Sequence, residues 1–375
     1  MVSDGLGVPR SAPSPLLPDF DAIVGWMPVV PDWSGRLERG VTVMGGPAAR
    51  ELVASGRVSY LPVRYSALPR LLTGLLRPAV AVISARPDPR GLRFGLEVGY
   101  AQIAAMAAER IVVEVDPGLP RVPGAPLLER RDVEVVEAES PPPELEAGAA
   151  SPVDAEIGRR IAQLVPEGAT VQYGPSVIGD AAIRALAVRV RVHSGMVTDA
   201  LADLARRGLL AAPATAAYLL GGSPVRDLAE AGEITLRGVE ETHSPAALAR
   251  LERFVAINAA LSVGLDGAVN VERAGGRLVG GVGGHPDFCA AAAASPGGLS
   301  IIGVRSSRGG RSNIVPTAAP VSTPRSDVDL VVTEHGVADL RGLDDRRRAE
   351  ALIAVADPAL RDPLERSLPP LAGGG

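Results

Sequence analysis

The chain has 375 residues, of which 46% are hydrophobic and 22% charged, as is ordinary for soluble globular proteins. This length exceeds one ordinary hydrophobic core and predicts two domains. The net charge of −5 weighs against nucleic acid as a partner, because such a partner requires a basic face. No uninterrupted apolar run reaches the ~20 residues of a membrane helix, so no membrane partner is predicted.

A single cysteine, Cys289, allows no internal disulfide and favours a reducing compartment. The first residues lack the basic start and apolar run of a signal peptide, so we predict a cytoplasmic protein. All 38 basic residues are arginine, which with the heavy Ala, Gly and Pro usage indicates a GC-rich, bacterial coding bias. The four histidines show no metal-ligand spacing, and neither a metal nor a tightly bound cofactor is expected.

The first half alternates strand-like and helix-like segments after an opening stretch, residues 1–40, that we expect to be irregular with at most one short strand. The continuous apolar run Ala79–Ser84 is typical of a strand buried on both faces of a parallel sheet. Further strands are expected at Val41–Met44, Val58–Val63 and Arg110–Val115, and helices at Ser66–Leu75 and Val98–Ala108.

A Pro-rich, acidic stretch at residues 139–152 cannot pack a core and favours an extended spacer. We therefore predict a first domain over residues 1–140, a linker at 141–153 and a second domain over residues 154–375.

The second half continues the alternation, which predicts an α/β fold with open, largely parallel sheets. Ligands of such sheets bind beyond the carboxyl ends of the strands, so the loops after Tyr173, Val304 and Thr333 are candidate sites. The expected helices are Asp154–Leu164, Asp180–Ala187, Val197–Arg207 and Asp345–Val355, and the expected strands are Ala169–Tyr173, Arg189–His193, Phe254–Asn258, Ser300–Val304 and Val328–Thr333.

Three short stretches carry groups suited to catalysis. The glycine-rich run 280–284 lets the backbone approach a ligand and offers N–H groups to an anion, although a plain turn is the alternative. Glu240 and Glu241 lie between a strand-like segment and a helix that begins near Ser244; either both are solvated or one faces a pocket. Gly336 follows a buried strand and offers a backbone N–H group.

Several of these stretches together resemble the acetyl-CoA hydrolase/transferase family, which includes the succinyl-CoA:acetate, 4-hydroxybutyrate and butyrate:acetate CoA-transferases. The resemblance covers residues 155–366 and is fainter in the first half, at Tyr60–Val63 and residues 107–124. The matching stretches, in order, are residues 192–200, 256–270, 280–288, 295–298, 314–316 and 323–342.

The resemblance implies two similar α/β domains of the CoA-transferase (NagB-like) type, the first shortened, with the active site between them. It also implies a catalytic glutamate that attacks the acyl-CoA carbonyl and forms an acyl-glutamyl anhydride as CoA thiolate leaves. CoA then returns to give a glutamyl-CoA thioester, which a second carboxylate resolves. Coenzyme A is thus a substrate, and a small carboxylate such as acetate is the other partner.

Residue roles follow from the same resemblance. Its arginine and proline spacing, counted from Arg237 and Pro245, indicates Glu240 as the nucleophile, with Glu241 as the alternative. Gly336 is similar to a glycine that donates an oxyanion-hole N–H. The other implied positions are Gly280, Gly281, Gly283 and Gly284 beside the CoA thiol arm, and Gly174, Ser176 and His243 in the substrate pocket.

The chain also departs from the family pattern. Relatives often carry a glutamate after the His-Ser pair, where this chain has Gly195. The first half lacks the expected opening strand and glycine-rich loop. We therefore predict a CoA-transferase, with an acyl-CoA hydrolase using the same glutamate and a catalytically impaired CoA-binding paralogue as alternatives, and a homodimer as the default assembly.

Overall fold

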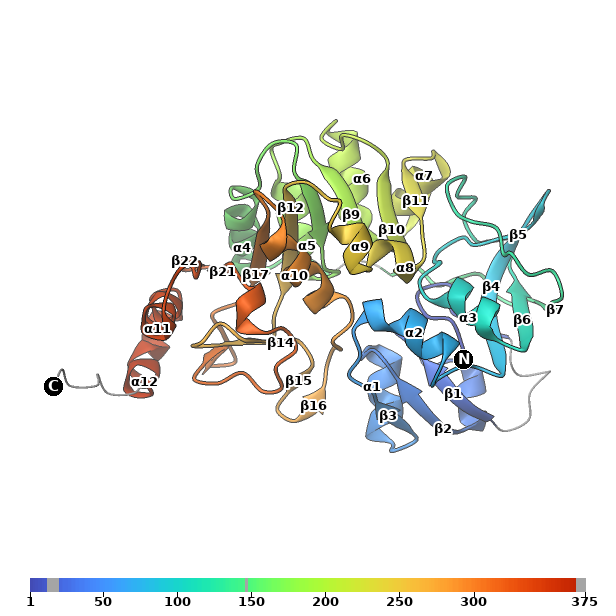
Figure 1. Ribbon diagram of the computed structural model, residues 1–375, viewed down its shortest axis with the longest axis horizontal. Helices are drawn as coiled ribbons and strands as arrows, with labels where there is room; N and C mark the ends of the chain where they lie inside the picture. Colours follow the sequence, from blue (N-terminus) through green and yellow to red (C-terminus); the bar gives the residue numbers. More distant parts are fainter. Residues whose placement is uncertain (12–19, 146–147, 369–375) are drawn as a thin grey trace.

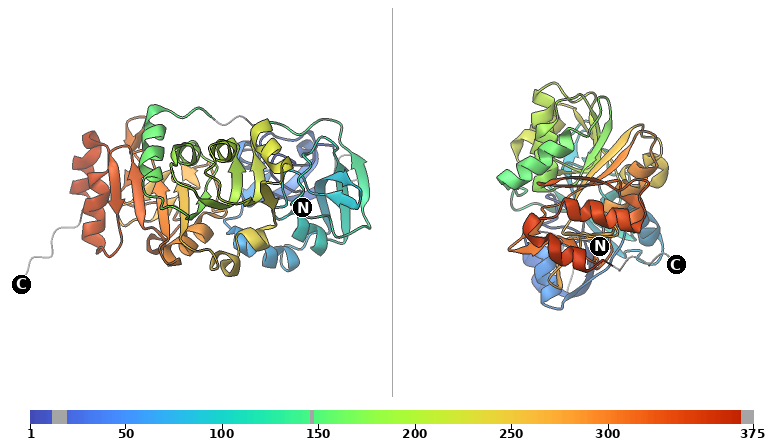
Figure 2. Two further views of the ribbon diagram at one scale, coloured as in Figure 1. Left: turned by 90° about the horizontal axis from the view of Figure 1, so that it is seen from above. Right: turned by 90° about the vertical axis from the view of Figure 1, so that its left-hand side faces the viewer.

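The computed structural model describes residues 1–11, 20–145 and 148–368. The N-terminal half lies at one end of the molecule, a large sheet lies in the middle, and two C-terminal helices lie at the other end (Figure 1). The view from above shows the same succession along the long axis (Figure 2). No helix among the described residues is long and apolar enough to cross a membrane.

The N-terminal half contains a three-stranded and a four-stranded sheet. The first has the order β1-β2-β3 and is parallel, and the second has the order β5-β4-β6-β7, with only β5 antiparallel. Val2 joins them, because its N–H donates to Ile23 of β1 and it forms a parallel bridge with Val82 of β4. The strands are β1 (Phe20–Val24), β2 (Leu37–Thr42), β3 (Val58–Tyr60), β4 (Val80–Asp88), β5 (Gly91–Arg93), β6 (Arg110–Val115) and β7 (Glu134–Glu137).

The opening stretch, residues 1–40, is more ordered than expected, because it holds the short strand β1 and the start of β2. Val2 occupies a strand position, and Gly5 and Gly7 follow it closely. The signal was missed because one bridging residue shows no periodic pattern. Three helices accompany these strands, α1 (Pro47–Ala54), α2 (Leu68–Thr73) and α3 (Ala101–Ala107).

The C-terminal half is built on an eight-stranded sheet of order β11-β10-β9-β8-β12-β17-β21-β22, in which only β22 is antiparallel. From β8 the chain winds outward to β11, then returns and continues from β12 in the opposite direction. The switch point of this sheet therefore lies between β8 and β12. The strands are β8 (Thr170–Tyr173), β9 (Arg191–Thr198), β10 (Ala214–Leu220), β11 (Ile234–Leu236), β12 (Phe254–Ala259), β17 (Leu299–Gly303), β21 (Leu330–Thr333) and β22 (Gly336–Asp339).

Helices cover both faces of this sheet. Four successive helices pack side by side on one face, and α10 (His285–Ala294) packs on β12 and β17 from the other. The four are α4 (Pro152–Ala162), α5 (Val177–Ala185), α6 (Asp199–Arg206) and α7 (Ser223–Glu230). The remaining helices are the short α8 (Val239–Thr242) and α9 (Pro245–Leu248), and the C-terminal α11 (Asp345–Ala354) and α12 (Arg361–Arg366).

The two halves share one hydrophobic core, which includes Leu6 and Ile83 as well as Val171 and Leu201. Main-chain hydrogen bonds also cross between them: Val98 N donates to Ala217 O, and Val239 N donates to Gly99 O. The halves are thus held against each other by buried apolar contacts and by backbone pairing.

The predicted α/β class with largely parallel sheets is confirmed, since the expected strands of the second half all lie in the eight-stranded sheet. Two expectations need adjustment. The strand expected at Arg189–His193 runs on to Thr198 as β9, and Glu240 and Glu241 lie in α8 rather than in extended backbone. The proposed domain boundary at 141–153 stays a prediction; the helix α4 begins inside it, at Pro152.

Candidate functional site

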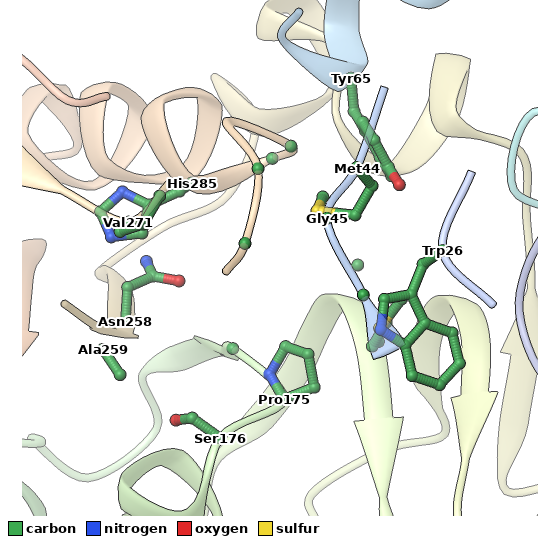
Figure 3. Close-up of a pocket in the computed structure, with 18 of the residues that line it drawn as sticks. Trp26, Met44, Gly45, Tyr65, Pro175, Ser176, Asn258, Ala259, Val271 and His285 are labelled. Atoms are coloured by element: carbon green, nitrogen blue, oxygen red, sulfur yellow. The ribbon is translucent and has the colours of Figure 1, made fainter. Parts of the chain in front are cut away.

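A cavity of about 410 Å³ lies between the two halves, and we call it the central cavity. Its C-terminal wall includes Tyr173 to Ser176, which follow β8, and Asn258 and Ala259 at the end of β12. These strands flank the switch point, where open parallel sheets bind their ligands. Figure 3 shows Pro175, Ser176 and Asn258 on one side, and Trp26, Met44 and Tyr65 of the N-terminal half facing them.

The N-terminal half closes the cavity against the glycine-rich loop, residues 280–284. Gly45 N donates to Gly280 O over 3.1 Å, and Tyr65 N donates to Gly283 O over 3.0 Å. The Tyr60 hydroxyl accepts from Val282 N over 3.0 Å. A Cβ on Gly45 would lie only 2.2 Å from Gly280 O, so this close approach requires glycine.

The glycine-rich loop leads directly into α10, whose first residue is His285. Among the described residues, the main-chain N–H groups of Gly281 and Gly284 have no hydrogen-bond acceptor, whereas Gly283 forms a parallel bridge with Arg64. Free N–H groups at the N-terminus of a helix favour negative charge. The loop is therefore suited to stabilise the oxyanion of an attacked thioester carbonyl.

The floor of the cavity is polar and uncharged. Gln172 and Asn258 exchange two side-chain hydrogen bonds, of 3.2 and 3.1 Å, although both are almost fully buried. His285 places Nδ1 2.7 Å from Thr323 Oγ1, while its Nε2 is buried without a partner among the described residues. Burial lowers the pKa of His285 to about 4, so this imidazole is neutral at neutral pH.

His243 lies next to the glycine-rich loop and is 2% exposed. Its ring packs between Tyr65 and Phe288, with centroid distances of 5.3 and 4.7 Å. Burial, followed by the influence of His193, lowers the pKa of His243 to about 3. It therefore contributes a neutral imidazole to the cavity.

The structure brings most of the predicted site residues together. Seven of them line the central cavity, namely Gly174, Ser176, His243, Gly280, Gly281, Gly283 and Gly284. Glu240 and Gly336 do not line it.

Glu240 lies in the first turn of α8, and its carboxylate folds back over Gly238. Its Oε2 is buried and has no hydrogen-bond partner among the described residues. Desolvation by burial raises the pKa of Glu240, and the nearby Glu241 and Glu129 raise it further. The exposed Glu241 forms an ion pair with Arg237. The role of Glu240 as nucleophile stays a prediction.

Gly336 begins β22 at the outer edge of the sheet, opposite Thr333. Three strands, β12, β17 and β21, separate it from β8. The loops after Val304 and Thr333, which we had considered as candidates, do not line the cavity either. Strand order explains this result, because only β8 and β12 flank the switch point.

Sequence reasoning missed the lining residues of the N-terminal half, Trp26, Met44 and Tyr65, and also Asn258 and His285. Asn258 could have been predicted from the sequence, because it ends a buried apolar strand at the edge of the sheet where ligands are expected to bind. The three N-terminal residues carry no local signal, because only the packing of the two halves brings them to the cavity.

The protein is thus of the α/β class, and its glycine-lined candidate site lies between two halves built on largely parallel sheets. Residues 225–368 match the model of the acetyl-CoA hydrolase/transferase C-terminal domain. A 4-hydroxybutyrate coenzyme A transferase of Clostridium kluyveri is 33% identical over 339 residues, which cover 85% of this chain and 79% of that protein. The chain therefore belongs to the acetyl-CoA hydrolase/transferase family, a family of enzymes, as the motifs predicted.

Two further relatives show the range of this family. The crystal structure of RipA from Yersinia pestis is similar with a TM-score of 0.84 and 28% identity, over 97% of this chain and 92% of that one. An acetyl-CoA hydrolase of Eremothecium gossypii is 32% identical over 231 residues, which cover 56% of this chain and 42% of that protein. Names of both transferases and hydrolases thus occur among its relatives.

Proposed function

We propose that the protein binds an acyl-CoA thioester in the central cavity, with the thioester carbonyl against the glycine-rich loop, and cleaves it with water. The observation that carries this proposal is the character of the lining. Among the described residues that line the cavity, none carries a carboxylate, whereas free N–H groups and neutral polar side chains converge there. A glutamyl relay requires a carboxylate within reach of the thioester, but hydrolysis requires only a held water.

The uncharged floor supports the hydrolytic reaction. Asn258 and His285 offer hydrogen-bonding groups to a water molecule, and the N–H groups of Gly281 and Gly284 are free to donate to the oxyanion that forms when water attacks. In that step the water oxygen bonds to the carbonyl carbon, the C–S bond breaks and the proton passes to the CoA sulfur.

A CoA-transferase that uses Glu240 is the second candidate. It is favoured by the family to which the chain belongs and by Oε2 of Glu240, which is buried and has no hydrogen-bond partner among the described residues. Glu240 also precedes His243, which lines the cavity, by only three residues in the sequence. In this reaction the carboxylate would have to turn from its place above Gly238 into the cavity.

Acetyl-CoA turnover separates these functions. CoA release is measured with and without acetate or propionate in wild type, Glu240→Gln and the matched neighbour Glu241→Gln. We expect release that is independent of added carboxylate and unchanged in both variants. Carboxylate-dependent exchange that only Glu240→Gln abolishes would establish the transferase. Tight CoA binding without any turnover would identify the impaired paralogue.

A further inference from the structure

Two glycines face the same imidazole ring at the floor of the central cavity. A Cβ on Gly195 of β9 would lie 2.9 Å from His243 Nε2, and a Cβ on Gly284 would lie 2.6 Å from the same nitrogen. Side chains do not approach this closely, and the Tyr65 and Phe288 rings pack against the imidazole as well. The ring therefore fills the space into which a side chain at position 195 would point.

The hydrogen bonds of His243 define its tautomer. Thr242 Oγ1 donates to Gly238 O over 3.0 Å, because a carbonyl can only accept. Its contact of 2.8 Å with His243 Nδ1 is then donated by the imidazole. Nε2 consequently carries a lone pair between Gly195 and Gly284. The group beside position 195 is a neutral hydrogen-bond acceptor.

We propose that His243 occupies the space that a reactive side chain at position 195 would need, so that this chain handles a bound thioester without an acyl-protein intermediate. The inference rests on the proposed function and deepens it. Position 195 lines the cavity beside the glycine-rich loop, and the described lining holds no carboxylate that replaces it. The pair Gly195 and His243 then determines whether CoA is transferred to a second carboxylate or released to water.

The pair Gly195 and His243 excludes a reaction that a carboxylate at position 195 would allow. With a carboxylate at position 195 and the imidazole removed, a carboxylate oxygen would bond to the thioester carbonyl carbon. The C–S bond would break, and CoA would leave as a thiolate with the electron pair. Return of the thiolate to the side-chain carbonyl would release the acyl group as a carboxylate and leave a side-chain CoA thioester. An added carboxylate would attack that thioester and expel CoA as a thiolate, which would then attack the new acyl carbonyl of the anhydride, giving a new acyl-CoA and the free side-chain carboxylate.

The test traps the intermediate. Wild type, His243→Ala and the double variant Gly195→Glu with His243→Ala are mixed with acetyl-CoA and quenched with hydroxylamine. Intact-mass and peptide mass spectrometry then locate a hydroxamate. We expect none in wild type or His243→Ala, and a hydroxamate at position 195 in the double variant, together with propionate-dependent CoA exchange at least tenfold above wild type. Gly195→Glu alone should lower the melting temperature, because its side chain meets Nε2.

A hydroxamate on any carboxylate of the wild type would overturn the inference, and this arm does not depend on the folding of a variant. A double variant that binds CoA with wild-type affinity and yet forms no hydroxamate would also overturn it. Calorimetry with CoA is performed first on the wild type. Failure to bind CoA, or CoA release that depends on an added carboxylate, would refute the proposed function itself. Carboxylate-independent CoA release together with a trapped intermediate would refute only the inference.

Discussion

The two halves of the molecule wind their strands in the same order but differ at the switch point. In the C-terminal half, the strands β8 to β11 are added in order toward one edge of the sheet, and β12, β17 and β21 toward the other edge. The loops after β8 and β12, on either side of this switch point, line the central cavity. In the N-terminal half, Val2 and β1 to β3 follow one another toward one edge, and β4, β6 and β7 toward the other edge. The equivalent point lies beyond Val2 and is filled by the buried Asp4.

Side chains account for this difference. Asp4 Oδ2 accepts from Trp26 N over 3.3 Å and from the Tyr65 hydroxyl over 3.4 Å. Glu97 is also buried and accepts from Gly7 N over 3.0 Å. Because Trp26 and Tyr65 also line the central cavity, the filled switch point lies directly behind its N-terminal wall. The strand order therefore creates a switch point in each half. Side chains fill the one in the N-terminal half and leave the one in the C-terminal half open as the central cavity.

The largest effect expected from this comparison concerns pH. Burial raises the pKa of Asp4 to about 7 and that of Glu97 to about 8, from ordinary values near 4. The folded protein then binds protons that the unfolded chain has lost, so the free energy of unfolding is highest below pH 4 with respect to these groups. It falls as the pH rises toward 8, by about 4 kcal/mol for each group.

Denaturant unfolding of wild type, Asp4→Asn and Glu97→Gln between pH 4 and pH 8.5 measures this dependence. Asp4→Asn and Glu97→Gln should each reduce the decrease in the free energy of unfolding with rising pH. The control Asp227→Asn, at an exposed position, should leave this decrease unchanged. An identical pH profile in all four proteins would show that neither carboxyl group is responsible.

A smaller effect is expected at the wall of the open crevice. The substitution Gly45→Ala introduces a Cβ 2.2 Å from Gly280 O, a backbone atom that can yield only by shifting the glycine-rich loop. Overpacking of this kind costs about 2 kcal/mol, which corresponds to roughly 30-fold weaker CoA binding if the loop forms the site. Calorimetry with CoA measures it. The control is Gly35→Ala, where an added Cβ meets nothing within 4 Å; equal affinity in both variants would contradict the role of the loop.

The smallest effect, a coupling free energy of about 1 kcal/mol, is expected between the two side chains of the polar pair at the open switch point. Gln172 and Asn258 satisfy each other through two hydrogen bonds, so removal of either side chain leaves the other buried without that partner. Gln172→Ala and Asn258→Ala should each destabilise the fold by about 1 to 3 kcal/mol, and the double variant should cost less than the sum of the two. A double-mutant cycle by urea unfolding measures the coupling, expected at about 1 kcal/mol; additive effects would show that the pair acts independently.

Local sequence patterns were sufficient for the strands and for part of the site. Apolar, β-branched runs such as Phe254–Asn258 specify buried parallel strands without reference to their neighbours. The glycine-rich loop and the loop after Tyr173 were identified because strand ends and glycine clusters are themselves local features, while the family resemblance indicated Gly174 and Ser176 within the second loop. His243 was also identified, but from the family resemblance, which gave no indication that it fills the space beside Gly195.

What the sequence by itself determined is the α/β class, the family and the segments that reach the ligand edge of the second sheet. The tertiary structure alone decided which strand ends meet, and it placed three strands between Gly336 and β8. It also set Trp26, Met44 and Tyr65 opposite the C-terminal wall and left Glu240 outside the lining. The physical reason is that strand order and the packing of the two halves depend on contacts between residues far apart in the chain, whereas periodicity and turn composition record only their neighbours.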